Sequence, residues 1–293
     1  MTDGRSDGQT AGRSDGRSIL HLSDLHFGGR ADLAQIEALE RLVPELAPAA
    51  VVISGDLSQR ARHGEFQRAL AFVAACRRVA PTLVVPGNHD VSWWASPFGI
   101  RGRGPLYRKY RRYFGDDLGP VLQIPGVVIV GTVSANGLAA GSVTWNPRDL
   151  TVKGHLPTAE TDRAAATFAR TDPGLLRIVV LHHNVLRGQI SDRWGLAHPL
   201  DTQRRLLASG ADLVLCGHDH QEWVGQIDAR IVVAASSTHT PMTRGKRPSA
   251  FNLIEFDDQR LRLRFMRWHR NGATFEPADG FEFARATRRL PAQ

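Results

Sequence analysis

Five short groups of polar residues in this 293-residue chain follow apolar runs, and their side chains are types that bind metals or carry protons. They are Asp24-Leu25-His26, Gly55-Asp56, Gly87-Asn88-His89-Asp90, His182-His183 and Gly217-His218-Asp219-His220. A short apolar run that ends in Gly or in turn-forming residues is typical of a buried strand. Because ligand sites of α/β proteins lie beyond the carboxyl ends of the strands, the pattern predicts that these groups meet at one site.

Each group, taken alone, has an ordinary structural explanation. Asn and Asp are common in turns and helix caps. A His after an apolar run is more often a hydrogen-bonded residue at the edge of the core than a ligand. Five groups in one chain, all at predicted strand ends, are hard to attribute to turns, and together they favour a metal centre.

The residue types indicate which metals such a centre would take. Carboxylates, imidazoles and an amide oxygen, without a thiolate, suit borderline ions such as Mn, Fe, Zn or Co. Seven candidate ligands exceed one tetrahedral site and fit two ions that share a bridging carboxylate. On an extended strand end, Asp24 and His26 would point to the same side, as would His218 and His220.

The apolar periodicity predicts the elements that position these groups. Helical spacing occurs in LAQIEALERLVPEL, FQRALAFVAACRRV, PLYRKYRRYF, TAETDRAAATFAR and DTQRRLLASG. Besides the strands that precede the five groups, strands are predicted in VLQIPGVVIVGTV, ARIVVAASST and FNLIEFDDQRLRLRFMRWH. These runs are too apolar for strands with one face in water, so they imply parallel or mixed sheets covered on both faces.

The order of elements predicts an α/β fold, a four-layer αββα sandwich in which two mixed β-sheets pack together with helices outside. Residues 18–293 show no second boundary and are predicted to form a single domain. Residues 1–17 repeat a Gly-Arg-Ser-Asp-Gly unit without an apolar run, so we expect a disordered N-terminal tail.

The composition narrows the classes of partner and compartment. The formal net charge of +8 suits anionic substrates, nucleic acid or an acidic membrane surface, although it equally fits a bias of genome composition. No apolar run approaches the roughly 20 residues that span a bilayer. Two distant cysteines, Cys76 and Cys216, argue against a disulfide framework, and we expect a cytoplasmic protein without a signal peptide or transmembrane segment.

The order Asp-x-His, Gly-Asp, Gly-Asn-His-Asp, His, Gly-His-x-His resembles the calcineurin-like metallophosphoesterase superfamily, over about Ile19 to Phe256. Within it, the chain is similar to bacterial cyclic-nucleotide phosphodiesterases, except that Asn184 follows His183 where those members often have Pro. The resemblance implies that one metal ion is held by Asp24, His26 and His220. It implies that a second is held by Asn88, His182 and His218, with Asp56 as the bridge. His183 is the alternative to His182.

The resemblance also implies a reaction. A hydroxide that bridges the two ions attacks phosphorus, so no protein nucleophile is required. His89 is not a ligand but faces the phosphate, where it stabilises charge or protonates the leaving group. Asp90 hydrogen-bonds His89 and orients it, unless it merely caps the following segment. The expected activity is metal-dependent hydrolysis of phosphodiesters, on cyclic nucleotides or other small diesters.

Two features near the motifs are candidates for substrate contacts. Trp93 follows the His89 motif and could stack a base, and His183 is a second candidate. The segment RGRGPLYRKYRRYF interleaves basic and aromatic residues as a nucleic-acid surface would. However, Tyr107, Tyr110 and Phe114 share one helical face, which favours an amphipathic helix whose aromatics lie in the core.

Other functions stay open on the sequence. The positive charge would also suit hydrolysis of a phospholipid or lipid-linked pyrophosphate at a membrane surface, although no amphipathic membrane helix is evident. A DNA nuclease is less favoured, because the chain has no coiled-coil partner signature and no additional DNA-binding domain. A non-enzymatic scaffold is disfavoured because every ligand position is filled.

Overall fold

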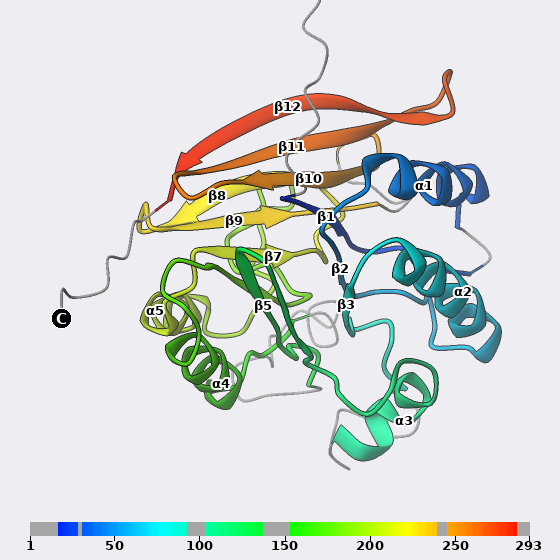
Figure 1. Ribbon diagram of the computed structural model, residues 1–293. Coiled ribbons are helices and arrows are strands. Elements are labelled where there is room, and N and C mark those ends of the chain that lie inside the picture. Colours follow the sequence, from blue (N-terminus) through cyan, green and yellow to red (C-terminus); the bar gives the residue numbers. More distant parts are fainter. Residues whose placement is uncertain are drawn as a thin grey trace, which may run out of the picture.

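The computed structural model describes residues 17–28, 31–92, 103–136, 153–238, 245 and 247–285. Two mixed β-sheets lie back to back in this part of the chain, with helices on the outer face of each (Figure 1). The predicted αββα sandwich is therefore confirmed. Of the expected N-terminal tail, residues 1–16 lie outside the described residues.

The first sheet has six strands, half of them parallel and half antiparallel. In spatial order they are β12 (Thr274–Ala284), β11 (Arg260–His269), β10 (Ala250–Phe256), β1 (Ser18–Leu22), β2 (Ala50–Ser54) and β3 (Thr82–Val85). Strands β1, β2 and β3 run parallel, whereas β10, β11 and β12 form an antiparallel meander beside β1. The carboxyl ends of β1, β2 and β3 therefore lie at one edge of the sandwich.

The second sheet also has six strands. Their spatial order is β4 (Val121–Ile124), β5 (Val127–Gly131), β6 (Leu176–Val180), β7 (Leu213–Cys216), β9 (Ile231–Ala235) and β8 (Trp223–Ile227). Strands β5, β6, β7 and β9 are parallel, and the two outer strands are antiparallel to their neighbours.

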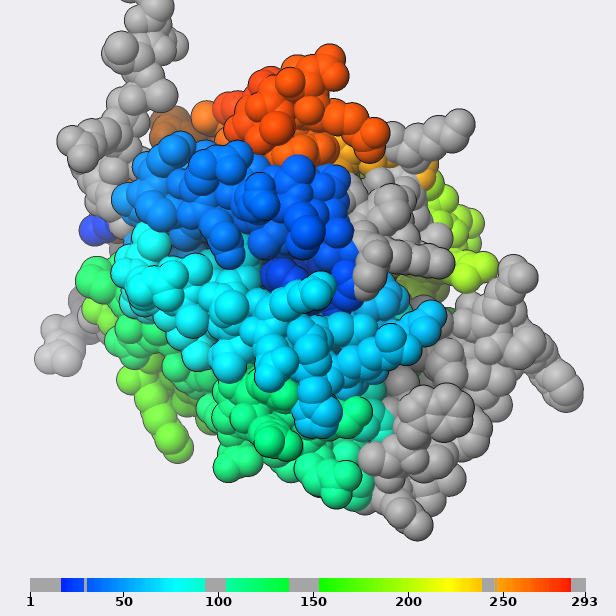
Figure 2. All heavy atoms as spheres, turned by 90° about the vertical axis from the view of Figure 1, so that its right-hand side faces the viewer, coloured from blue at the N-terminus to red at the C-terminus, as the bar shows by residue number. Residues whose placement is uncertain are grey.

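Alternating side chains build three apolar layers. In β1, Ile19 points between the sheets, whereas Leu20 and Leu22 point to the outer helices. Helices α1 (Leu33–Leu46), α2 (His63–Val79) and α3 (Arg103–Phe114) cover the first sheet, and Figure 2 shows this helical face. Helices α4 (Thr158–Ala169) and α5 (Pro199–Ser209) cover the second.

The predicted strands and helices are all present, but β8 and β12 were missed. Both are edge strands. Strand β12 contains Pro277 and Gly280, and β8 contains Gly225, residues that weaken the strand pattern and discourage pairing with a further strand. An edge strand half exposed to solvent needs little apolar alternation, so its sequence carries a weak signal.

Two smaller expectations are confirmed. Tyr107 and Tyr110 are buried in the core beneath α3, so the aromatics of this basic helix are packing residues. Cys76 and Cys216 are free and buried, and burial raises the pKa of the Cys76 thiol to about 12.

In the part of the chain that the structure describes, none of the helices has the length and apolarity needed to cross a membrane.

Candidate metal centre

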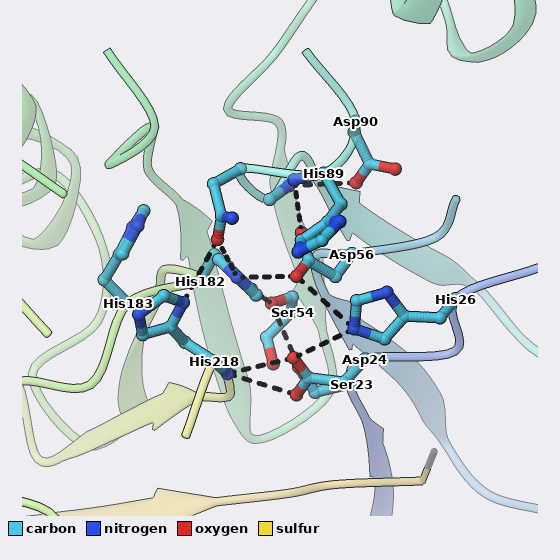
Figure 3. A network of polar contacts seen from close by, with 12 residues as sticks. Ser23, Asp24, His26, Ser54, Asp56, His89, Asp90, His182, His183 and His218 are labelled. Atoms are coloured by element: carbon cyan, nitrogen blue, oxygen red, sulfur yellow. Dashed lines mark hydrogen bonds and ion pairs between the residues drawn. The ribbon is translucent and has the colours of Figure 1, made fainter. Parts of the chain in front are cut away.

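All seven predicted ligands converge where strands of both sheets end. Figure 3 labels five of them, Asp24, His26, Asp56, His182 and His218. Asp24, Asp56 and Asn88 follow β1, β2 and β3 of the first sheet. His182 and His218 follow β6 and β7 of the second. The five groups thus meet at one site, as the sequence predicted.

One set of side chains surrounds a point between Asp24, His26, His220 and Asp56. Their ligand atoms lie within 4.8 Å of one another. The Nε2 atoms of His26 and His220 face each other at 3.2 Å, and His220 Nε2 lies 3.5 Å from Asp24 Oδ1. Asp56 Oδ2 completes the set, 3.5 Å from His26 Nε2.

A second set lies on the other side of Asp56. Asn88 Oδ1 is 3.0 Å from His182 Nε2 and 3.1 Å from His218 Nδ1. His182 Nε2 is also 3.2 Å from Asp56 Oδ2. The same Asp56 oxygen therefore borders both sets, which is the position that a bridging carboxylate requires.

Backbone conformation differs from the extended strand ends that the sequence suggested. Asp24, His26, Asp56, His218 and His220 all have positive φ, between 45° and 73°. Asp24 and His26 therefore converge through left-handed turns, not through alternation along a strand. Left-handed conformations are uncommon for residues other than Gly and cluster at functional sites, where the surrounding structure imposes them.

Glycines before the motifs are required by close approach. A Cβ atom on Gly87 would lie 2.1 Å from Asp56 Oδ1, and one on Gly217 would lie 1.8 Å from Ser23 Oγ. Gly55 has a φ of 94°, and a Cβ there would lie 2.7 Å from His182 Nδ1. The glycines thus allow loops of different strands to pack directly against the ligand side chains.

The electrostatics are those of a crowded, buried acid–imidazole cluster. Burial disfavours the charged form of Asp56, but His182 and His89 beside it hold its pKa well below the usual range. Burial also opposes charge on His182, yet Asp56 raises the pKa of His182 to about 9. Burial raises the pKa of Asp24 and lowers that of His218. The imidazoles around Asp56 therefore favour its ionised form.

The donor set fits two metal ions. Two carboxylates, four imidazoles and one amide oxygen are ligands for borderline metals, and they form two sets that share Asp56. His182 Nδ1 donates to the Ser54 carbonyl at 2.9 Å, which leaves Nε2 free to ligate. Facing nitrogens such as those of His26 and His220 need a proton or a metal ion between them, because two imidazole lone pairs repel.

His89 lies beside the cluster without joining it. Its backbone N–H donates to Asp56 Oδ1 at 2.8 Å, and its ring meets the His26 ring edge-on at 4.8 Å. Nδ1 donates to the Gln59 carbonyl at 2.8 Å. Nε2 is therefore the ring atom that can exchange a proton with a bound molecule.

The hydrogen bond expected between the His89 ring and the Asp90 carboxylate is not formed among the described residues, because His89 Nδ1 donates to the Gln59 carbonyl instead. This expectation was wrong. Asp90 is fully buried, and its carboxylate accepts from the backbone N–H groups of Leu57, Ser58 and Gly87, and from Ser58 Oγ. Burial, followed by the charge of Asp56, raises the pKa of Asp90 to about 6. Asp90 ties the loop after β2 to the loop after β3, and Gln59 orients His89.

The two substrate-contact candidates have different outcomes. His183 is buried, its Nδ1 lies 2.9 Å from Ser134 Oγ, and its ring points away from Asp56 (Figure 3). It packs against His218 at a ring distance of 4.5 Å, so it supports a candidate ligand rather than lining an open pocket. Trp93 lies outside the described residues.

Several residues that orient the cluster were missed from the sequence. Ser54 and Gln59 act through backbone carbonyls, and Ser58 and Ser134 through hydroxyls. A backbone acceptor leaves no signature in residue type. The serines do follow apolar runs, in ISGDLS and TVSAN, which is the one signal that could have indicated them.

We predict that Asp90→Asn destabilises the protein by about 3 kcal/mol, because an amide nitrogen would then face backbone N–H donors that are buried. The measurement is the free energy of unfolding in denaturant. Asp117→Asn is the control, since Asp117 is exposed and accepts from one backbone N–H, that of Gly119. Native stability combined with an altered pKa of the His89 imidazole would instead support the role expected from the sequence.

Solved structures with the same fold include two phosphatases. A dimetal phosphatase from Danio rerio is 14% identical, with a TM-score of 0.63 and coverage of 92% of this chain and 99% of that one. Purple acid phosphatase PPD1 from yellow lupin (Lupinus luteus) seeds is 13% identical, with a TM-score of 0.61. That match covers 92% of this chain, which spans about half (54%) of the lupin protein.

Proteins with this fold are not all described as phosphatases. GAP50, described as the anchor in the inner membrane complex of Plasmodium, is 11% identical, with a TM-score of 0.56. That match covers 93% of this chain and 90% of GAP50. No curated protein matches the chain significantly. The family model of the calcineurin-like phosphoesterases matches residues 17–222, most of the chain, and the protein therefore belongs to that family.

Proposed function

We propose that this protein is a binuclear-metal phosphoesterase that hydrolyses phosphodiester bonds. The observation that carries the proposal is the position of Asp56 Oδ2, which lies 3.5 Å from a nitrogen of one ligand set and 3.2 Å from a nitrogen of the other. We assign Asp24, His26 and His220 to one ion. Asn88, His182 and His218 are assigned to the other, and Asp56 to both.

Two bound ions would offset the charge of the phosphoryl oxygens and supply a nucleophile from water at neutral pH. The protein's own residues position and support this chemistry. Hydrogen bonds from the His218 backbone N–H fix both Asp24 oxygens, each at 3.1 Å. Ser54 fixes the ring orientation of His182, so the ligand atoms are held in place before substrate arrives.

His89 is the residue we assign to proton transfer or charge stabilisation. Because Nδ1 donates to the Gln59 carbonyl, Nε2 is the ring nitrogen that can hold or release a proton at the site. A proton on Nε2 can be donated to the oxygen of a departing alkoxide or can stay and balance phosphoryl charge. His89 is half-buried, in contrast to the fully buried His182, so it lies at the accessible side of the cluster.

The finer proposal is that small diesters are the substrates, in the manner of cyclic-nucleotide phosphodiesterases. No Lys or Arg directly precedes or follows any of the seven ligand candidates in the sequence. A monoester dianion would gain from such cations, whereas a diester carries one negative charge that two ions and His89 can offset. Tyr107 and Tyr110 of the basic helix α3 are buried, so neither ring offers a stacking surface for nucleic acid.

We predict that the active protein contains two metal ions per chain and loses activity to chelators. Asp56→Asn should lower the content of both ions and reduce kcat by about 10²–10³-fold, because charge stabilisation at the reacting centre is lost. His26→Ala should empty mainly one site. Metal analysis by mass spectrometry and hydrolysis of bis-p-nitrophenyl phosphate measure both effects.

Asp257→Asn is the matched control for these variants, since Asp257 is an exposed carboxylate in the turn between β10 and β11. It should keep native metal content and activity. One ion or fewer per chain in a fully active preparation would refute the binuclear assignment.

We predict that His89→Ala keeps both metal ions and lowers kcat by about 10²–10⁴-fold for substrates with poor leaving groups, the usual scale for a general acid. The loss should be smaller for nitrophenyl esters, because nitrophenolate leaves without a proton. The measurement compares alkyl and nitrophenyl diesters at saturating substrate. Equal losses for both classes would assign charge stabilisation alone to His89.

We predict a higher kcat/KM for small diesters than for monoesters or polymers. The comparison uses a cyclic nucleotide, bis-p-nitrophenyl phosphate, p-nitrophenyl phosphate, a phospholipid head-group diester and a single-stranded oligonucleotide, each at two salt concentrations. An oligonucleotide preferred at low salt and strongly inhibited by added salt would instead favour a nuclease. A monoester that exceeds every diester would refute the proposed substrate class.

A further inference from the structure

The candidate ligands are divided between the two sheets. Asp24, His26, Asp56 and Asn88 follow strands of the first sheet, whereas His182, His218 and His220 follow strands of the second. Both ligand sets contain members from each sheet. The geometry of the centre therefore depends on how one sheet is registered against the other.

The apolar layer between the sheets cannot set that register alone. It consists of side chains such as Ile19, Val52 and Ile254 of the first sheet and Ile129, Ile178 and Leu215 of the second. Hydrophobic contacts stabilise burial but have no direction, so small slides of one sheet on the other change them little. Hydrogen bonds between the sheets are directional and do resist such slides.

A buried polar cluster lies in this layer at the end nearest the ligands. His21 of β1, Ser54 of β2 and Asn252 of β10 are fully buried. His21 and Asn252 are directly opposite on adjacent strands, and Val52 is the neighbour of His21 on β2. His21 thus occupies an inward position where Ile19, two residues earlier, is apolar.

The hydrogen bonds of Asn252 fix its orientation. Asn252 Nδ2 lies 3.2 Å from the carbonyl oxygen of Ala235, at the end of β9 in the second sheet. A carbonyl only accepts, so this atom is the amide nitrogen, and it also donates to His21 Nδ1 at 2.9 Å. Asn252 therefore connects the first sheet to the second and determines the tautomer of His21.

The cluster continues from His21 toward a candidate ligand. Because Nδ1 accepts, Nε2 carries the proton and donates to Ser54 Oγ at 2.9 Å. Burial lowers the pKa of His21 to about 3, which keeps the ring neutral. The Ser54 carbonyl in turn accepts from His182 Nδ1 at 2.9 Å, which also connects the sheets. Beside these side-chain contacts, backbone hydrogen bonds of 2.7 and 3.1 Å pair Ser237, after β9, with Ala250 of β10.

We propose that His21, Ser54 and Asn252 form an inter-sheet clamp, which fixes the register of the two sheets and so positions the two halves of the metal centre. They are positioning residues, since none of them is a candidate ligand. This inference rests on the proposed metal centre. Buried hydrogen bonds of this kind rigidify the surrounding structure, and each of the three side chains makes at least one of them, although Asn252 Oδ1 has no hydrogen-bond partner among the described residues.

The test compares two substitutions of His21. His21→Leu removes both hydrogen bonds, whereas His21→Gln keeps an acceptor and a donor at a similar separation. Calorimetric titration of the metal-free proteins with Mn²⁺ should show affinity reduced about 10–100-fold in His21→Leu, the usual effect of losing a group that orients ligands. His21→Gln should restore most of the affinity.

Val52→Ala is the matched control, because Val52 is buried beside His21 on the same inward face but makes no directional contact through its side chain. It should lower the thermal midpoint of the metal-free protein while leaving the Mn²⁺ affinity unchanged. The exchange-coupled electron paramagnetic resonance signal of two adjacent Mn²⁺ ions should weaken in His21→Leu and persist in Val52→Ala.

Ser54→Ala serves if His21→Leu does not fold, since it removes one hydroxyl and keeps the carbonyl that holds His182. A smaller loss of Mn²⁺ affinity is expected for it. Native affinity in His21→Leu or Ser54→Ala, or an equal loss in Val52→Ala, would overturn the clamp and leave the metal centre standing. A native protein that binds no Mn²⁺ would overturn the proposed function itself.

Discussion

The position of the Asp56 carboxylate is the constraint on which the candidate centre depends. One oxygen accepts from the His89 backbone N–H at 2.8 Å, and the other faces imidazole nitrogens from both ligand sets. The loop after β3 approaches this carboxylate closely, since a Cβ on Gly87 would lie 2.1 Å from Oδ1. The loops after β2 and β3 must therefore pack with glycine at their contact. The Asp90 carboxylate joins the same loops, because it accepts hydrogen bonds from the backbone N–H groups of Leu57, Ser58 and Gly87.

That arrangement has an energetic cost. Five of the seven candidate ligands have positive φ, at roughly 1 kcal/mol or more each for residues other than Gly. The conformations are held by bonds from outside each turn: Asp24 N–H donates to Gly55 O at 3.0 Å and His26 N–H to Asp56 O at 2.8 Å. These strained turns lower the stability locally, but they allow several ligand side chains to converge on one point. Extended strand ends would not bring these side chains together.

The sequence was sufficient for the fold and for the identity of the converging residues, because both depend on residue type and order. Apolar runs placed the strands, and the polar groups at their ends predicted the cluster around Asp56. The sequence was insufficient where backbone atoms or backbone conformation determine the contacts of a side chain. The carbonyl of Gln59 takes the place expected for the Asp90 carboxylate beside His89. The left-handed turn at Asp24 has no sequence signature, and the one at His218 has none beyond the adjacent Gly217. Edge strands β8 and β12 were missed because pairing on one side needs no regular alternation.

Metal binding and sheet packing are linked in this architecture. The ligand sets draw on both sheets, so an ion that binds the assembled cluster stabilises the packed sandwich by mass action, about 2.7 kcal/mol at a free concentration 100 times the dissociation constant. The same linkage acts in reverse, since any change that loosens the packing of the two sheets must lower the affinity of the centre for the ion. The layer between the sheets divides these tasks by position. Apolar side chains such as Ile178 and Ile254 supply burial along its length, and the buried polar side chains His21, Ser54 and Asn252 lie at the end near the ligands. Directional contacts are needed next to the ion sites, and there hydrogen-bonded side chains take the place of apolar ones.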